Sequence, residues 1–400
     1  MTISQEIVSN NQSKVALVAA IAATLLVQSI ISLLAASIPV LTPEIAADRG
    51  WNATFIALYP ALVLTTAFLI SFQIPFLLTR LGGMGLGLAC IGVSAIGLLC
   101  VTSPMLGLVI ISPIAIGMAA GAMNPASSQV LGSRTPPHLT GFIMSLKQTG
   151  VPIGTALAGL LLPFFVFRFQ WKITAIGLAM LSAAVAVALL PITRWLDGSP
   201  RQAPPQHRPF EPVKQLWAMT GMAQFLLAGT AAGAAQYCLR SFYMVYLVKN
   251  VGLDLSTAGL IFGVSQAAGI VGQIAWASLS DQVLRPHTTI GLIGLTIAGA
   301  SLLSAMTTHD WPLIGILFTA ALFGVSAAGF IPVVLAEVAR KAPNGQIGAL
   351  TSGVNVFLFA GAAIGPLLFG GLAAYVSYSL AFVALAAVTF FAGLGALRFR

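Results

Sequence analysis

Long, uninterrupted runs of apolar residues are the feature that most constrains the fold of this chain. A transmembrane helix needs about 20 mostly apolar residues, and many such runs follow one another along the 400 residues. None alternates between apolar and polar residues as the strands of a membrane barrel do, so helix is the expected spanning element. Only 7% of the residues are charged, whereas a soluble protein carries roughly 25%. The sequence therefore predicts an all-α membrane protein.

Twelve transmembrane helices are expected, joined by mostly short connections. They cover residues 15–38, 52–77, 84–103, 105–131, 139–163, 171–191, 215–247, 256–279, 288–306, 312–337, 345–373 and 376–397. A polar leader precedes the first run, and no small-residue cleavage pattern closes it, so we interpret it as a helix and not as a signal peptide. The three cysteines lie in apolar runs, which favours buried thiols over disulfides or a metal site.

The distribution of basic residues predicts how the chain lies in the membrane. The formal net charge is +9. If the N terminus is cytoplasmic, most lysines and arginines fall in inner loops, and only Arg49, Arg168, Lys172 and Lys249 fall in outer ones. This asymmetry follows the positive-inside rule. We therefore expect a bacterial inner (plasma) membrane protein with both termini in the cytoplasm, whose partner is the lipid bilayer and not a nucleic acid.

The chain divides into two halves with related sequences. Residues 194–214 form its most polar stretch, rich in proline, and are expected to be a cytoplasmic linker between bundles at 1–193 and 215–400. A shift of 207 residues aligns backbone-constraining positions without a gap. The aligned pairs include Pro125 with Pro332, Pro136 with Pro343, Gly141 with Gly348, Gly154 with Gly361, and Gln148 with Asn355. Such repeats of six helices are a transporter architecture with a binding site near mid-membrane.

These features resemble the major facilitator superfamily over nearly the whole length. The resemblance implies two six-helix bundles that rock about a central substrate cavity. The family's loop after its second helix reads G-x-L-A-D-R-x-G-R and acts as a conformational latch, a contact that holds one state of the transporter. Here the stretch from Pro75 to Gly83 keeps Arg80 but has Thr79 in place of the aspartate, whereas the second-half copy keeps Asp281. The resemblance thus makes Arg80 and Asp281 the expected latch residues.

Glycines and prolines in the fifth and eleventh expected helices also look like a family motif often found in antiporters. They include Gly150, Pro152, Gly154, Gly365 and Pro366. Small residues let helices approach closely, and proline permits bending. Tight packing explains the pattern as well as a direction of transport does, so the motif is not used to infer efflux.

Two cations without an evident partner mark the candidate binding site. Every acidic residue falls in a loop or at a helix end, but Lys147 and Arg240 lie well inside expected spans. Uncompensated charge there costs a few kcal/mol or more, and a substrate anion would supply the missing countercharge. Arg240 has amide and phenol neighbours suited to a carboxylate. The alternatives are a pair with a loop acid or a helix-end carbonyl for Arg240, and snorkelling to the inner surface for Lys147.

Neutral polar residues near these cations complete the expected site. Some could line the cavity, and for each the alternative is an interhelical hydrogen bond. The expected substrate-binding residues are Arg240, Lys147, Gln148, Gln236, Tyr237, Tyr243, Asn355, Gln28 and Gln266.

No enzyme signature accompanies this site. There is no phosphate-binding P-loop and no histidine or cysteine cluster, so neither catalysis nor a metal or other cofactor is expected. We predict a secondary active transporter for a small organic anion such as a carboxylate, driven by protons or a counter-anion. Proton-driven efflux of amphipathic compounds or drugs, and a transporter-like membrane sensor or assembly factor, remain as alternatives.

Overall fold

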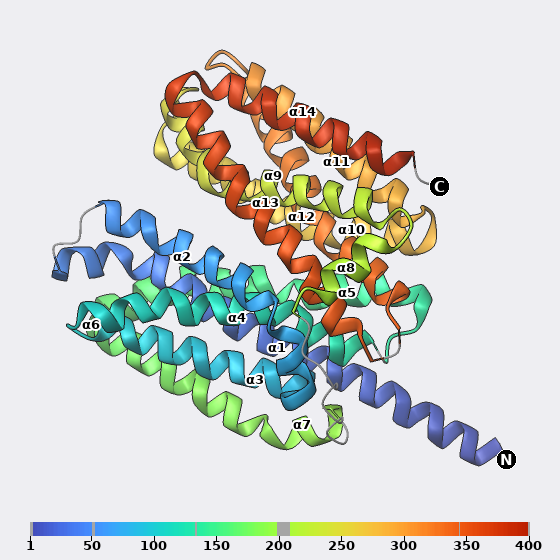
Figure 1. The fold of residues 1–400 in the computed structure, drawn as a ribbon. Helices are drawn as coiled ribbons and strands as arrows, with labels where there is room; N and C mark the ends of the chain where they lie inside the picture. The colour runs from blue at the N-terminus through green and yellow to red at the C-terminus, as the bar shows by residue number, and fades with distance from the viewer. Residues whose placement is uncertain (1–2, 50–52, 133, 198–208, 344, 399–400) are drawn as a thin grey trace. The chain divides into compact units, whose positions relative to one another are not determined.

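The computed structural model describes residues 3–49, 53–132, 134–197, 209–343 and 345–398, and all regular elements among them are helices (Figure 1). They form two compact units, one of residues 1–137, 146–212 and 341–355, the other of residues 138–145, 213–340 and 356–400. Most of the expected linker, residues 198–208, lies outside the described residues. The bundle boundaries at 193 and 215 stay a prediction.

The first unit consists mainly of six helices that pack through small side chains. They are α1 (Ile3–Arg49), α2 (Ala53–Ser71), α3 (Ile74–Thr102), α4 (Leu106–Gly132), α6 (Gly150–Ala188) and α7 (Leu190–Asp197). Helix α1 packs on α6, and α3 packs on α4 and α6. The unit also takes in the last residues of α5 (Thr140–Gln148) and the first part of α13 (Ile347–Tyr375).

The second unit holds the remaining helices. They are η1 (Pro137–Leu139, a 3-10 turn), α8 (Glu211–Ala218), α9 (Met222–Lys249), α10 (Leu255–Gln282), α11 (Pro286–Met306), α12 (Leu313–Lys341) and α14 (Tyr378–Leu397). Helices α11 and α14 lie side by side, and α9 packs on both. Helices α5 and α13 each pass from one unit into the other, since α5 enters the first unit at Leu146 and α13 enters the second at Val356.

Three residues with a left-handed φ break the long apolar runs. Gln170, with a φ of 65°, separates two helical segments within α6, and the expected span 171–191 begins at the next residue. Gly82, with a φ of 74°, kinks α3 just before the expected span 84–103. The third break differs from the expectation: the run 215–247 is expected as one helix, but Gly221, with a φ of 75°, separates α8 from α9. Glycine adopts such a φ without steric cost.

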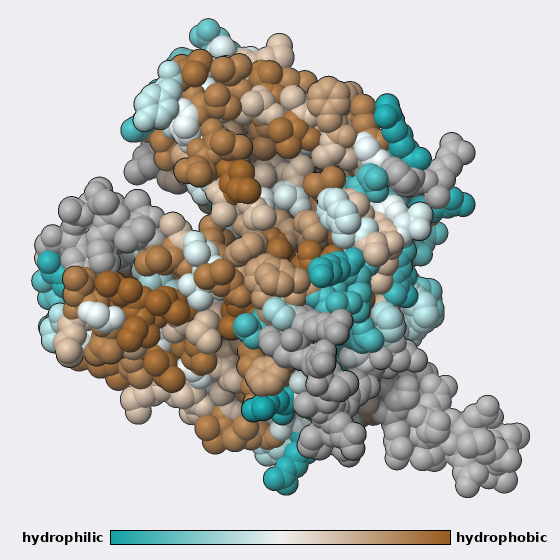
Figure 2. Space-filling model, viewed as in Figure 1, coloured by the Kyte–Doolittle hydropathy of each residue, from teal (hydrophilic) through white to brown (hydrophobic). Residues whose placement is uncertain are grey.

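The helices have the length and surface of a multi-pass membrane protein. Among the described residues, nine stretches are long and apolar enough to cross a bilayer, and one of them, Pro137–Ala188, is 52 residues long and holds two of the expected spans. Figure 2 shows hydrophobic residues over much of the helical surface. Phe167 is 93% exposed and Leu367 is 75% exposed, which is unfavourable in water and suits a lipid solvent. The all-α membrane fold is confirmed.

Close approach of α1 and α6 depends on Gly154. A Cβ atom at this position would lie 2.1 Å from the backbone oxygen of Ser29, whereas a Cβ on Gly159 in the same helix would meet nothing within 4 Å. We expect Gly154→Ala to lower stability by about 1–3 kcal/mol through overpacking, measured as a lower thermal unfolding midpoint in detergent. Gly159→Ala is the matched control, and it is expected to be neutral or slightly stabilising because alanine favours helix. Equal midpoints for the two variants would contradict the packing argument.

Candidate functional site

The most unusual side chain in the first unit is Lys147, which lies near the end of α5 and is 0% exposed. Its Nζ donates to the Oδ1 atom of Asn124 on α4 over a long 3.4 Å. No ion pair joins Lys147 to a carboxylate within the described part of the chain. A charged amine that is buried with one neutral acceptor among the described residues is poorly compensated.

A second buried hydrogen bond in the first unit joins two glutamines, one of which, Gln148, follows Lys147 in the sequence. The Nε2 atom of Gln28, on α1, donates to Oε1 of Gln148 over 2.9 Å, and both side chains are buried. The Oε1 atom of Gln28 is itself buried and has no hydrogen-bond partner among the described residues. Gln28, Thr24 and Ser127 line a small cavity of about 10 Å³, which is about the size that holds one water molecule. The cavity at Gln28 thus has an acceptor that is not used within the described part of the chain.

The side-chain amide of Asn355 makes a hydrogen bond to another helix of the first unit. It is buried on α13, and its Nδ2 donates to the backbone oxygen of Gly121 on α4 over 2.7 Å. The repeat partners Gln148 and Asn355 therefore both bridge helices, but through different atoms. An interhelical contact accounts for Asn355, and its role in binding stays a prediction.

The other predicted ligands lie in the second unit and do not share one environment. Arg240 on α9 is exposed, and its guanidinium stacks over the ring of Tyr237 at 5.8 Å. Gln236 is buried on the same helix. Tyr243 is buried in an aromatic cluster with Tyr246, Phe323 and Phe382. Packing of the aromatic ring thus accounts for the position of Tyr243, and its role in binding stays a prediction.

Gln266 on α10 lies in the second unit as well. It is half-buried, and its Nε2 contacts the hydroxyl of the adjacent Ser265 at 3.2 Å. This contact is local and brings Gln266 to none of the other predicted ligands. The structure thus places Lys147, Gln148, Gln28 and Asn355 in the first unit, and Arg240, Tyr237, Gln236, Tyr243 and Gln266 in the second.

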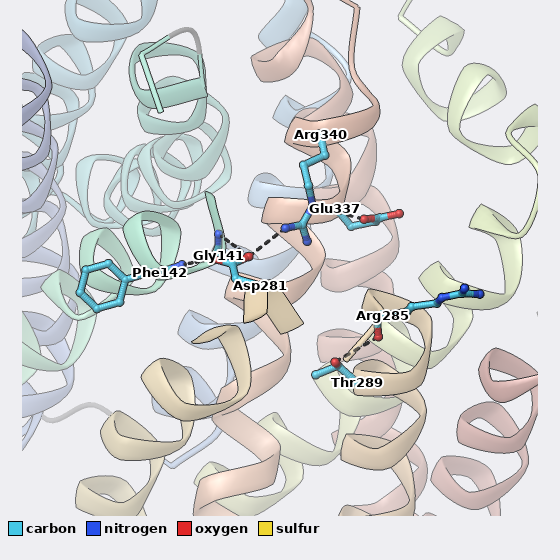
Figure 3. A network of polar contacts seen from close by, with 7 residues as sticks. All are labelled: Gly141, Phe142, Asp281, Arg285, Thr289, Glu337 and Arg340. Atoms are coloured by element: carbon cyan, nitrogen blue, oxygen red, sulfur yellow. Dashed lines mark hydrogen bonds and ion pairs between the residues drawn. The ribbon is translucent and has the colours of Figure 1, made fainter. Parts of the chain in front are cut away.

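Asp281, at the end of α10, holds the start of α5 through two backbone hydrogen bonds (Figure 3). Its Oδ1 accepts from the Gly141 amide over 3.0 Å, and its Oδ2 accepts from the Phe142 amide over 2.9 Å. Its side chain is 1% exposed and pairs with Arg340 at 2.8 Å. The first amides of a helix lack partners within it and carry partial positive charge. The carboxylate therefore satisfies two of them and balances one guanidinium.

The first-half latch residues make no comparable contact. Thr79 bonds its hydroxyl to the Phe76 carbonyl of its own helix at 2.8 Å, and Arg80 stacks over the Phe76 ring at 4.5 Å. At the repeat position of Gly141, the amide of Gly348 donates to Oε1 of Gln129 over 2.8 Å. Sequence reasoning missed Gln129, although the pairing of Gly141 with Gly348 pointed to a helix start that needs an acceptor.

A chain of apolar membrane helices, with a buried cation and capped helix starts, defines a polytopic membrane protein of the transporter class. The family model "Major Facilitator Superfamily" matches residues 22–289 and 225–400. The chain belongs to the Major Facilitator Superfamily.

Two relatives illustrate how the family resembles this chain in sequence. The uncharacterized MFS-type transporter Rv2994 of Mycobacterium tuberculosis is 24% identical over 269 residues, and the match covers 66% of this chain and 58% of the relative. The chain thus spans less than two thirds of that relative's length. The hexuronate transporter of Bacillus subtilis is 21% identical over 186 residues, which cover 45% of this chain and 44% of the relative.

Solved structures share the fold. The transporter FucP in its outward conformation matches with a TM-score of 0.74 at 15% identity, covering 96% of this chain and 99% of FucP. A bacterial homologue of the iron transporter ferroportin, in an outward-facing state, matches with a TM-score of 0.71 at 14% identity, covering 95% of this chain and 99% of the homologue. At these identities the likeness concerns the fold alone.

Proposed function

We propose that this protein is a secondary active transporter that moves a small organic anion, such as a carboxylate, by alternating access. The observation that carries the proposal is the complete burial of Lys147 with one neutral acceptor at 3.4 Å. A carboxylate entering the site would supply the missing countercharge. Gln148, which follows Lys147 in the sequence, and its partner Gln28 are the amides assigned to the site. The relative named as a hexuronate transporter carries a carboxylate-bearing sugar, which supports this substrate class.

The proposal assigns further roles to residues described above. Arg240, exposed in the second unit, is a second anion-binding cation, and Asp281 is the conformational latch. Protons or a counter-anion supply the drive. The protein lies in the bacterial inner membrane with both termini in the cytoplasm, as the distribution of basic residues favours.

A ligand panel tests the substrate class. Full-length protein in detergent is heated with mono- and dicarboxylates, the uncharged sugars that match them in size, and lipophilic cations. A ligand at about 100 times its Kd should add roughly 2.7 kcal/mol of stability, so the cognate carboxylate is expected to raise the unfolding midpoint and its neutral analogue is not. The stabilising compound is then tested for uptake into proteoliposomes.

Each other outcome favours a named alternative. Stabilisation by lipophilic cations alone would favour efflux of amphipathic compounds. Stabilisation by a carboxylate without any flux, in either direction and with either a proton or an anion gradient, would favour a membrane sensor. If an uncharged sugar and the matching carboxylate stabilise the protein to the same extent, the carboxylate group is not recognised and the substrate class proposed here is wrong.

A further inference from the structure

A large cavity lies in the first unit, between the start of α3, the end of α4, α7 and the start of α13. Its volume is about 660 Å³, within the range of about 300–1,000 Å³ that holds small ligands. It is separate from the small cavity at Gln28, and of the predicted site residues only Arg80 lines it. The charged residues that line this cavity indicate what kind of ligand it could bind.

Three guanidinium groups and one carboxylate line this cavity, those of Arg80, Arg134, Arg194 and Asp197. Asp197 is committed to the backbone, because its two oxygens accept from the amides of Met84 at 2.7 Å and Gly85 at 2.8 Å. These amides begin the straight part of α3 after the kink at Gly82, where a Cβ would lie 2.5 Å from the carboxylate. The one acid of the cavity thus serves as a helix cap.

Arg134 is also held in place. It donates to the carbonyls of Val130 and Leu196. Burial lowers the pKa of its guanidinium, and the charge of Asp197 acts in the opposite direction. Arg134 and Asp197 therefore form the fixed, charge-balanced part of the cavity wall.

Arg80 and Arg194 remain as the uncompensated cations. Both are exposed, they come from different helices, and neither has an ion pair within the described part of the chain. Arg80 is oriented by its stacking on Phe76 at 4.5 Å. Two planar guanidinium groups on opposite elements of one cavity suit the tetrahedral oxygens of a phosphate, which arginine binds through paired hydrogen bonds.

The rim of the cavity is apolar as well as basic. Leu81 and Leu190 line it and are exposed. Trp195 follows Arg194 in α7, lies outside the lining and is 52% exposed. Tryptophan is enriched where a protein meets the membrane interface, and basic pockets between helices on the cytoplasmic side bind anionic lipid head groups. The two arginines and the exposed apolar residues near them together suit an anionic head group that carries acyl chains.

We propose that this cavity binds a phosphate group through Arg80 and Arg194, and that its natural source is an anionic phospholipid. The site is distinct from the proposed substrate site at Lys147. A lipid bound here would link α3 to α7 and so stabilise the first unit.

The test follows the thermal unfolding of the full-length, detergent-purified protein as lipid is added. Phosphatidylglycerol is expected to raise the midpoint by about 3 °C or more above the same amount of phosphatidylcholine. The double variant Arg80→Gln/Arg194→Gln should lose this difference. Arg285→Gln is the matched control, because Arg285 is exposed, basic and outside the cavity, and it should keep the difference. The variant Arg80→Lys/Arg194→Lys should retain part of it.

Two further arms separate the outcomes. Inorganic phosphate that reproduces the shift, with loss in the double variant, would support the phosphate site and overturn the lipid as its source. Equal shifts from both lipids in the wild type, or a phosphatidylglycerol shift unchanged in the double variant, would overturn the site.

In wild-type protein, brominated phosphatidylglycerol should quench tryptophan fluorescence more than brominated phosphatidylcholine, and this excess should vanish in Trp195→Phe. Excess quenching that persists in Trp195→Phe places the lipid elsewhere.

Discussion

Replacing Lys147 by methionine is expected to weaken carboxylate binding and, at the same time, to make the unliganded protein more stable. The ammonium is fully buried with one long hydrogen bond to Asn124, so its removal relieves a desolvation cost of about 1–3 kcal/mol. A hydrogen bond to a charged group is worth about 1.5–3 kcal/mol, so carboxylate affinity should fall by about 10- to 150-fold. Thermal unfolding with and without the carboxylate measures both effects.

The two measured changes, in the stability of the unliganded protein and in its affinity for the carboxylate, together distinguish a binding role of Lys147 from a structural one. If Lys147 only holds α5 to α4, the methionine variant will be less stable than the wild type. The rise in its unfolding midpoint on adding the carboxylate will then equal that of the wild type. Lys172→Met is the matched control, since Lys172 pairs with Asp48 at 2.9 Å on the surface, and such pairs contribute about 0–1 kcal/mol. It should leave both stability and anion response nearly as they are.

Asp281→Ala is expected to destabilise the second unit by about 1–3 kcal/mol, because buried donors lose a charged acceptor. The carboxylate is 1% exposed and pairs with Arg340 at 2.8 Å, while Arg340 is 22% exposed and keeps a second partner, Glu337, at 3.5 Å. The Gly141 and Phe142 amides would also lose their acceptor. The measurement is the thermal unfolding midpoint in detergent, which should fall by several degrees.

A double-mutant cycle assigns this effect to the ion pair. Arg340→Met in the Asp281→Ala background should cost less than it does alone, with a coupling of about 0.5–3 kcal/mol. Asp310→Ala, at an exposed acid, should change stability by no more than about 0.5 kcal/mol. Additive effects at Asp281 and Arg340 would show that the latch is not built on this pair.

Much of the fold could be predicted from the sequence because the bilayer imposes one rule on every helix. The expected span 288–306 and helix α11 (Pro286–Met306) agree closely, and so do 376–397 and α14 (Tyr378–Leu397). An error lies where one residue changes the backbone direction within an apolar run, as at Gly221, whose left-handed φ divides the expected span 215–247 into α8 and α9. A hydropathy profile cannot predict such a change, since it reports the free energy of transfer to lipid and not the backbone dihedral angles.

The site was predicted in part. Lys147, Gln148 and Gln28 could be chosen from sequence because polar groups in apolar spans need a reason to be there. The hydrogen bond between Gln28 and Gln148 could not be predicted, because it joins residues 120 positions apart. Gln129 and Asp197 carried no local signal either, since each acts on amides that lie far away in the chain. Only the folded structure shows which helix starts they cap.

The two helix starts related by the internal repeat have diverged in how their amides are satisfied. Gly141 donates to a carboxylate that also pairs with a guanidinium, while Gly348 donates to an uncharged amide. The first contact therefore depends on two charges, and the second depends on none. A substitution that removes the charge of Asp281 or Arg340 has no counterpart at Gln129, so two positions that correspond in sequence are held by contacts of different chemistry.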